Sequence, residues 1–311
     1  MTSKAPAYID ACRTGLLDER IEAARERLKC CTLCPRSCRI DRTAGETGVC
    51  RTGAEAWVSS YGPHFGEEAP LTGTGGSGTI FFTHCNLLCL FCQNYDISHG
   101  GAGDPVSAGQ LARMMLSLEN SGCHNINFVT PSHVVPQILE ALKPAVEGGL
   151  SVPLVYNTSA YDSVDTLKLL EGIVDIYMPD FKFWRPELAE KACGAKDYPD
   201  VARSAVREMH RQVGDLVIDA GGIARRGLLV RHLVLPKGLA DTGKVMQFIA
   251  AQVSPHTYVN IMPQYRPCGR AAEIDGLEGY PSRSDFAAAL KAARDAGITR
   301  LDEPRRTFML A

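Results

Sequence analysis

From Thr79 onward, short apolar runs rich in β-forming residues alternate with longer segments of helical spacing, and this alternation limits the fold more than any other feature. The runs expected as strands are 79–83, 126–130, 152–157, 174–178, 228–235 and 258–262. Helical spacing falls near 106–121, 134–147, 163–171, 198–214, 241–252 and 284–296. Strands and helices that alternate in this way predict a parallel sheet with right-handed crossovers.

This series of strand and helix units suits either an incomplete barrel or an open doubly wound sheet. We predict an α/β fold in which residues 71–311 form a partial (β/α)6 barrel resembling a TIM barrel. An N-terminal helical segment, 1–29, precedes it, with an exposed helix expected over 18–29. A cysteine-rich module and its linker occupy 30–70. In either architecture, the chemistry is expected at the C-terminal ends of the strands.

The charge balance and the hydropathy pattern exclude several classes of partner. The 33 basic and 35 acidic residues are spread along the chain and give a net charge of -2. The chain therefore has no basic face that would indicate a nucleic-acid partner. No apolar run approaches the roughly 20 residues that cross a bilayer, and the first residues lack the apolar core of a secretory signal. We expect a cytoplasmic protein without a nucleic-acid or membrane partner.

The chain has 12 cysteines, and most of them cluster. Disulfides hold together small secreted proteins, whereas 311 residues can bury a large core without them. The clustering therefore indicates metal or iron–sulfur ligation. The isolated cysteines are expected to be small buried hydrophobic residues: Cys12, Cys123, Cys193 and Cys268.

One cysteine group follows the first expected strand directly, in THCNLLCLFCQN. Cys85, Cys89 and Cys92 have the spacing C-x3-C-x2-C. Three thiolates on one loop can hold three irons of a cubane cluster and leave the fourth iron open to a substrate. A structural zinc site would need a fourth ligand, for which His84 and His99 are available.

At these residues the chain resembles the radical S-adenosylmethionine superfamily, whose signature has this spacing and an aromatic residue, here Phe91, before the last cysteine. The resemblance implies that Cys85, Cys89 and Cys92 hold a 4Fe-4S cluster. It also implies that the cluster reductively cleaves S-adenosylmethionine to methionine and a 5′-deoxyadenosyl radical, which abstracts hydrogen from a substrate. A flavodoxin or ferredoxin is the implied reductant.

The second expected strand ends differently from most of the superfamily, where a Gly-Gly-Glu segment binds the amino group of the methionine moiety. The corresponding stretch here is NFVTPSH, without Gly-Gly-Glu. Thr130 and Ser132 offer hydroxyls for the cofactor in its place. The alternative is a strand end that Pro131 turns, with no contact to a ligand.

The third and fourth strands end in YNTSAY and YMPDFKFW, which resemble segments of glycyl-radical-enzyme activating proteins. The resemblance implies that four residues surround the methionine moiety: Asn157, Thr158, Met178 and Asp180. It also implies that Lys182 reaches the carboxylate of that moiety, a charge-assisted contact. An ordinary ion pair between Asp180 and Lys182 at the strand end is the alternative.

RHLVLPKG and VNIMPQYRP, at the fifth and sixth strands, complete the resemblance. It implies that His232 packs against adenine, whereas the residues alone equally suit a core histidine with satisfied hydrogen bonds. Gln264, Tyr265 and Arg266 follow the sixth strand. They either line the substrate entrance or belong to a loop made irregular by prolines.

A second group of cysteines lies near the N-terminus. Four of them have the spacing C-x2-C-x3-C-x11-C: Cys31, Cys34, Cys38 and Cys50. Cys30 is an alternative to Cys31. Four thiolates form a closed site suited to structural zinc or to a second iron–sulfur cluster, and the sequence does not choose between them. Either would organise a short module that is poor in apolar residues.

From about residue 30 to 300 these motifs together resemble the group of proteins named after the pyruvate formate-lyase activating enzyme. The resemblance implies an activase-like enzyme that abstracts hydrogen from the glycine of a glycyl-radical enzyme. Another protein, a peptide or a small molecule is the alternative hydrogen donor. A different class of interpretation is a non-catalytic iron–sulfur or zinc protein that transfers electrons or acts as a scaffold.

Overall fold

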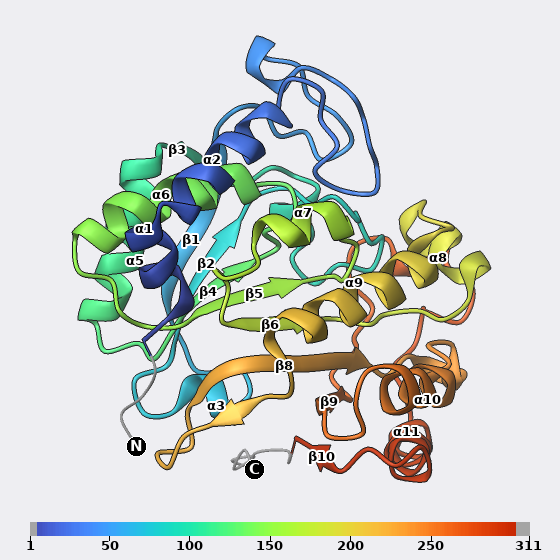
Figure 1. Cartoon of the computed structure of the whole chain (residues 1–311). Coiled ribbons are helices and arrows are strands. Elements are labelled where there is room, and N and C mark those ends of the chain that lie inside the picture. Colours follow the sequence, from blue (N-terminus) through green and yellow to red (C-terminus); the bar gives the residue numbers. More distant parts are fainter. Residues whose placement is uncertain (1–4, 303–311) are drawn as a thin grey trace.

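The computed structural model describes residues 5–302 and is built around one ten-stranded sheet (Figure 1). The strands are β1 (Ala56–His64), β2 (Ser77–Phe82), β3 (Asp104–Val106), β4 (Ile126–Val129), β5 (Leu154–Thr158), β6 (Ile176–Pro179), β7 (Val217–Ile218), β8 (Ala224–Leu233), β9 (Tyr258–Met262) and β10 (Arg300–Leu301). Their order in the sheet is β10-β9-β8-β6-β5-β4-β2-β1-β3, and β7 pairs with β8. The six strands expected from the sequence are all present.

Helices follow most of these strands. They are α1 (Ala7–Thr14), α2 (Leu16–Glu26), α3 (Ala69–Thr72), α4 (Tyr95–Ser98), α5 (Ala108–Asn120), α6 (Val135–Glu147), α7 (Val164–Leu169), α8 (Pro186–Cys193), α9 (Tyr198–Val213), α10 (Thr242–Gln252) and α11 (Arg283–Asp295). Every helix expected from the periodicity forms, and α3, α4 and α8 are additional. None of the helices in residues 5–302 is long and apolar enough to span a bilayer.

The strand order decides between the two expected architectures. β2, β4, β5, β6, β8 and β9 are parallel neighbours in the order of the chain. A doubly wound sheet reverses its strand order at one point, and this series does not. Sheet pairing ends at β3 and β10 in the described residues, so the sheet is not closed. The predicted partial (β/α)6 barrel is confirmed.

The two faces of the parallel strands bury different residues, because successive side chains point to opposite faces. The outer face packs on the helices and supplies the main core, to which Phe82, Phe128 and Val230 belong. The inner face carries a smaller apolar cluster: Leu71, Val155, Ile176, Met178, Leu216, Ala224 and Leu229. Asn157, Asp180 and Arg231 lie two residues beyond Val155, Met178 and Leu229. Alternation thus places polar groups at the carboxyl end of an apolar barrel floor.

β1 is a strand that the sequence analysis did not identify. It lies within 30–70, the range assigned to the cysteine-rich module and its linker, yet it pairs antiparallel with β2. Only its first half is regularly buried, so it lacks the apolar run typical of a central strand. The chain beyond β1 then reaches β8 and β9: Glu67 pairs with Arg231 at 3.2 Å, and Glu68 accepts a 2.7 Å hydrogen bond from Asn260.

The predicted N-terminal helical segment is a pair of helices, α1 and α2, both of which contact α6. The exposure expected over 18–29 is wrong in part, because Ala24 and Leu28 are buried, and Tyr8 and Leu17 before this range are buried as well. The Tyr8 hydroxyl donates to the carbonyl of Val152 at 2.9 Å, and the backbone N–H of Ala7 donates to Asp175 at 2.8 Å. These contacts attach α1 to the amino-terminal side of β5 and β6.

We expect Tyr8→Ala to release α1 locally without unfolding the barrel. Burial of one large apolar side chain contributes about 1.5–3 kcal/mol, which is enough to control local opening of a short terminal helix. Limited proteolysis should cleave within Ala7–Thr14 faster in this variant than in the wild type. Asp10→Ala, which removes only an exposed ion pair, is the matched control. Equal cleavage of the two variants would contradict the role assigned to Tyr8.

Candidate cofactor and metal sites

A cavity of about 390 Å³ opens at the carboxyl ends of the parallel strands. Eleven residues singled out in the sequence line it: Cys85, Cys89, Phe91, Cys92, Thr130, Asn157, Thr158, Asp180, Lys182, Gln264 and Tyr265. They come from the ends of β2, β4, β5, β6 and β9 and the loops that follow, and β8 contributes Arg231 and Leu233. The structure thus brings together most of the predicted site.

The three-cysteine loop is anchored by its own backbone and by α8. The N–H of Leu87 lies 3.3 Å from Cys85 Sγ, and the N–H of Leu90 donates to the carbonyl of Ala192 at 2.8 Å. His84 and Leu88 have φ values of 70° and 59°. A left-handed conformation is costly for a residue as bulky as leucine, so the surrounding contacts must hold this turn. The turn lets all three thiols line one cavity.

The electrostatics of the loop fit a metal–thiolate group. Burial raises the pKa of the Cys85 thiol to about 12 and also raises the pKa of Cys92. A bound cluster must therefore displace thiol protons. The charge of Lys182 works in the opposite direction and offsets a small part of the rise in the pKa of Cys89 and of Cys92. A cation thus stands beside the thiols where anionic ligands are needed, and the donor set fits a 4Fe-4S cluster.

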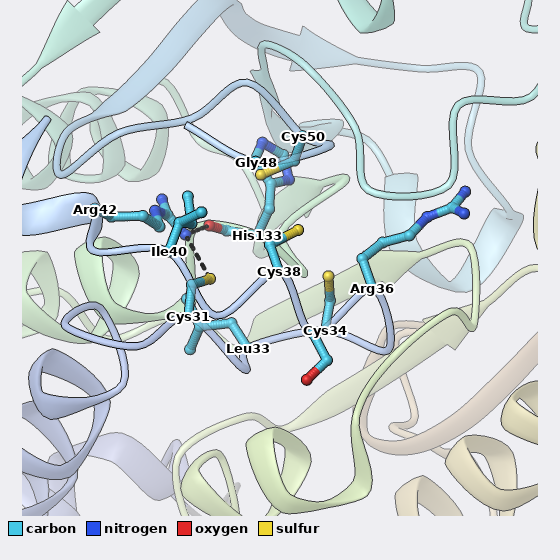
Figure 2. Close-up of a pocket in the computed structure, with 11 residues that line it drawn as sticks. Cys31, Leu33, Cys34, Arg36, Cys38, Ile40, Arg42, Gly48, Cys50 and His133 are labelled. Atoms are coloured by element: carbon cyan, nitrogen blue, oxygen red, sulfur yellow. Dashed lines mark hydrogen bonds between the residues drawn. The ribbon is translucent and has the colours of Figure 1, made fainter. Parts of the chain in front are cut away.

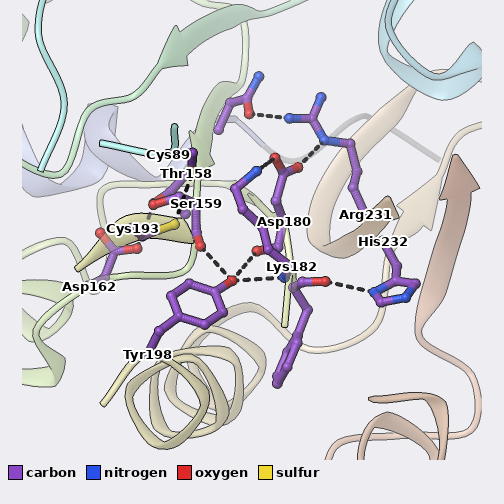
Figure 3. A network of polar contacts seen from close by, with 12 residues as sticks. Cys89, Thr158, Ser159, Asp162, Asp180, Lys182, Cys193, Tyr198, Arg231 and His232 are labelled. Carbon is purple, nitrogen blue, oxygen red and sulfur yellow. Dashed lines mark hydrogen bonds and ion pairs between the residues drawn. The ribbon is translucent and has the colours of Figure 1, made fainter. Parts of the chain in front are cut away.

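Cys193 joins this group, although it was expected to be only a small buried hydrophobic residue. Its Sγ lies 3.4 Å from Cys89 Sγ at the end of α8, and this contact is the main cause of the raised pKa of Cys89 (Figure 3). Cys193 is 104 residues from Cys89 and has no cysteine near it in the sequence. No sequence spacing could therefore have indicated the pair.

Asp180 is the centre of the charged network in Figure 3. Its carboxylate lies 2.6 Å from Lys182 Nζ and 2.6 Å from Arg231 Nε, and all three side chains are only 16% exposed. Arg231 also donates to Asn157 at 2.7 Å and pairs with Glu67. Burial raises the pKa of Asp180, but the two cations outweigh it and hold the pKa at about 2. The predicted strand-end ion pair is present.

Tyr198, at the start of α9, fixes the backbone that carries this network. Its hydroxyl accepts from the N–H of Lys182 at 2.8 Å and lies 2.9 Å from the carbonyls of Ser159 and Asp180 (Figure 3). Tyr198 is fully buried among aromatic rings and was not identified from the sequence. Tyr198 thus fixes the backbone of Lys182, from which the Lys182 side chain reaches back to the Asp180 carboxylate.

His232 does not line the cavity, contrary to the contact with adenine implied by the resemblance. It lies on the outer face of β8, fully buried, with Nδ1 2.7 Å from the carbonyl of Phe181 and Nε2 2.9 Å from the hydroxyl of Thr242. Burial lowers its pKa to about 4. The interpretation as a satisfied core histidine is the one that fits. Because side chains alternate along a strand, its neighbour Arg231 points into the cavity.

Three other predicted residues lie outside the cavity lining. The buried hydroxyl of Ser132 is 3.0 Å from that of Thr158, which donates to Asp162 at 2.6 Å. Thr158 borders the cavity, but its hydroxyl is engaged in this internal network. Met178 belongs to the apolar barrel floor, and Arg266 is exposed beyond β9. The carboxyl ends of parallel strands lie together, but successive side chains point to opposite faces of the sheet. Some residues at these ends therefore face away from the cavity.

The four N-terminal cysteines surround a second cavity of about 10 Å³, room for about one water molecule. The sulfur atoms of Cys31, Cys34, Cys38 and Cys50 gather around it (Figure 2). Cys30 is exposed and is not part of the lining. A Cβ atom at Gly48 would lie 2.6 Å from Cys38 Sγ, so a glycine is needed there.

Arg42 gives this second site its charge. It is 1% exposed, donates to the carbonyls of Gly53 and His133 at 2.7–2.9 Å, and has Nη1 4.0 Å from Cys31 Sγ. Within residues 5–302, no carboxylate pairs with it. A buried cation without an anionic partner is destabilising, and the cysteine thiols are the acidic groups beside it. The arrangement fits a metal held by thiolates.

The metal at this second site stays a prediction, zinc or a second iron–sulfur cluster. Over the described part of the chain, no three His, Cys, Asp or Glu side chains already converge as ligands of one ion would. Burial raises the pKa of Cys34 to about 12 and also raises that of Cys50, which Arg42 partly offsets. Metal binding would have to release thiol protons here, as it would at the three-cysteine loop.

The fold and the site define an α/β partial-barrel protein with one cysteine-lined cavity at the carboxyl ends of its strands and another in its N-terminal module. No family model matches the chain. The uncharacterized protein MJ0674 of Methanocaldococcus jannaschii is 31% identical over 289 residues, which cover 90% of this chain and 79% of that protein. The chain belongs to the same family as MJ0674.

Solved structures with a related arrangement have lower identity. The FeFe-hydrogenase maturase HydG matches with a TM-score of 0.49 and 15% identity over 72% of this chain and 50% of its own. Methylornithine synthase PylB matches with a TM-score of 0.45 and 15% identity, over 72% and 63%. The cobalamin-dependent S-adenosylmethionine radical enzyme OxsB matches with a TM-score of 0.38 and 12% identity, over 71% and 31%. The chain thus spans less than two thirds of each of these proteins.

We expect Asp180→Asn to lower the free energy of unfolding of the cluster-free protein by about 3 kcal/mol at pH 7, because it leaves Lys182 and Arg231 as buried cations without their shared carboxylate. The pKa of Asp180 is lower in the folded protein, about 2, than the ordinary 3.8, so its contribution is present above about pH 4 and lost as the pH falls towards 2. The difference between variant and wild type should narrow over that range.

Urea unfolding at several pH values measures this difference. Asp165→Asn is the matched control, because it removes an exposed carboxylate paired with Lys168. A difference for Asp180→Asn that is no larger than the control's at pH 7 would show that the network contributes little.

Proposed function

We propose that this protein is a radical S-adenosylmethionine enzyme. The observation that carries the proposal is that the thiols of the C-x3-C-x2-C loop share one cavity with the buried Asp180, Lys182 and Arg231 network. The 4Fe-4S cluster, when bound and reduced, supplies the electron that cleaves S-adenosylmethionine to methionine and a 5′-deoxyadenosyl radical, which abstracts hydrogen from the substrate.

The residues of the chain divide the work of binding. Cys85, Cys89 and Cys92 would hold the cluster through three of its irons, and the methionine moiety of S-adenosylmethionine would bind beside them. Asp180 stays ionised at neutral pH and suits an ammonium group, whereas Lys182 and Arg231 suit a carboxylate. These charged groups offset one another in the cavity. A zwitterionic ligand can therefore bind without adding a large net charge.

Aromatic packing around the loop limits the access of water. Phe91 meets the rings of Phe183 and Tyr265 edge to face, at centroid distances of 5.8 Å and 5.9 Å. The hydroxyl of Tyr265 donates to the carbonyl of Leu277 at 2.6 Å, which holds the ring in place. A wall of this kind protects a reactive carbon radical from side reactions.

We further propose an activase-like enzyme that takes hydrogen from a polypeptide glycine, with a flavodoxin or ferredoxin as the reductant. An exposed aromatic residue beside the cavity supports a polypeptide donor: Phe65 is 56% exposed, and His64 and Gly66 on either side of it line the cavity, while Tyr61 on β1 is 47% exposed. Exposed aromatic groups next to a binding cavity are typical of protein docking. A small-molecule donor, or a non-catalytic role in electron transfer or as a scaffold, is the alternative.

Release of 5′-deoxyadenosine tests the enzymatic proposal. Anaerobically reconstituted protein, reduced with dithionite, should form it from S-adenosylmethionine, and Cys89→Ala should lower the rate to the background level because one cluster ligand is lost. Cys123→Ala removes a buried thiol outside both cavities and should keep the wild-type rate. A fully loaded wild-type protein that forms no product would contradict the proposal and favour the non-catalytic alternative.

Deuterium transfer tests the hydrogen donor. With glycine-containing peptides labelled at the α-carbon, we expect deuterium in the 5′-deoxyadenosine, detected by mass spectrometry. Peptides labelled at alanine instead of glycine are the control. Product that forms without deuterium from any of these peptides would favour a small-molecule donor.

A further inference from the structure

Arg36 connects the two cysteine sites. It lies between Cys34 and Cys38 in the N-terminal module, and its side chain extends away from the four sulfur atoms (Figure 2). Its guanidinium donates to four carbonyl groups outside the module: Asn86 (3.0 Å), Leu87 (3.1 Å), Cys193 (2.7 Å) and Gly194. It also lies 5.3 Å from the centre of the Tyr161 ring.

These four carbonyl groups belong to the two segments that position Cys89. Asn86 and Leu87 belong to the three-cysteine loop itself. Cys193 contacts Cys89 through its sulfur, and its neighbour Ala192 accepts the N–H of Leu90. A rigid, planar guanidinium with several donors sets the spacing between both segments in a way that a single ammonium could not. Arg36 is therefore placed to hold the loop against the end of α8.

The position of Arg36 depends in turn on the N-terminal module, which has little core of its own. Its small hydrophobic cluster has Leu28, Cys31 and Leu33 as buried members. The only helical turn within 30–50 is Arg42–Ala44. Ser37 and Arg39, on either side of Cys38, have φ values of 43° and 55°, a conformation that is costly for both residues. A metal that ties Cys34 to Cys38 would fix this turn, because ligation contributes folding free energy to such modules.

We propose that metal bound by Cys31, Cys34, Cys38 and Cys50 positions Arg36, and that Arg36 in turn positions the three-cysteine loop for its own cluster. The N-terminal site is then a structural support for the three-cysteine site, and Arg36 is a positioning residue. The inference rests on the proposed function only for the identity of the group that the loop holds. The contacts between Arg36 and the loop belong to the protein itself.

Amide hydrogen exchange of the anaerobically reconstituted full-length protein, without S-adenosylmethionine, tests this coupling. The Leu90 amide is the probe, because it bonds to Ala192 next to the carbonyls that Arg36 holds. In Arg36→Gln, peptides containing Leu90 should exchange about tenfold faster, since charge-assisted hydrogen bonds control this local opening. Arg36→Lys, which restores the charge but not the planar group, should recover only part of the protection.

Two comparisons separate the proposal from a general loss of structure. Arg39→Gln is the matched control, because Arg39 is exposed and lies in the same turn, and it should leave Leu90 protected. Peptides from β5 should exchange as in the wild type in every variant. The metal content of the N-terminal site should also stay unchanged in Arg36→Gln, and iron should leave the three-cysteine site faster when a chelator is added.

Cys38→Ala tests the other half of the coupling. It should lose the N-terminal metal and expose Leu90 to exchange as Arg36→Gln does, and the double variant should add little, since both changes break one connection. The proposal is overturned if Arg36→Gln behaves as Arg39→Gln, or if loss of the N-terminal metal leaves Leu90 protected. Protection that depends on Arg36 in a protein that forms no 5′-deoxyadenosine would contradict only the proposed function.

Discussion

The ion pairs of Asp180 with Lys182 and Arg231 are the interaction on which the cavity depends. Through Arg231 they join the ends of β5, β6 and β8 to Glu67 in the segment that follows β1. Cations this deeply buried are tolerated only when anions accompany them. One carboxylate thus keeps two positive groups at the carboxyl end of the barrel, beside three thiols that would become anionic on binding iron.

The arginines of the N-terminal module have different partners from Arg231. Arg36, Arg42 and Arg51 stand between or beside the cysteines, and each donates to backbone carbonyls of the barrel rather than to a carboxylate. Carbonyls satisfy the hydrogen-bonding groups but do not cancel the charge. The module therefore stays cationic around its four thiols, which suits an anionic metal–thiolate centre. The same arginines attach this module to the loops after β2 and β4.

Much of the barrel could be predicted because its strands and helices have distinct periodicities and sufficient length. β1 was not predicted because only half of it is buried. In RHLVLP, the sequence drew attention to His232, whereas Arg231 lines the cavity. Both residues fit a strand, and the choice between them depends on which face of β8 meets the helices. Arg231 lies two residues after Leu229 and so on the same face of the strand. This spacing was the signal that could have distinguished Arg231 from His232.

The sequence by itself determined the series of strand and helix units, the two sets of cysteines and the strand ends at which polar groups gather. These features depend on short spacings, which local periodicity and ligand geometry encode. Only the tertiary structure decided that Cys193 meets Cys89, 104 residues away, and that Arg36 reaches Gly194, 158 residues away. Contacts of this kind depend on how α8 and the N-terminal module pack against the barrel, and no local pattern in the chain records that packing.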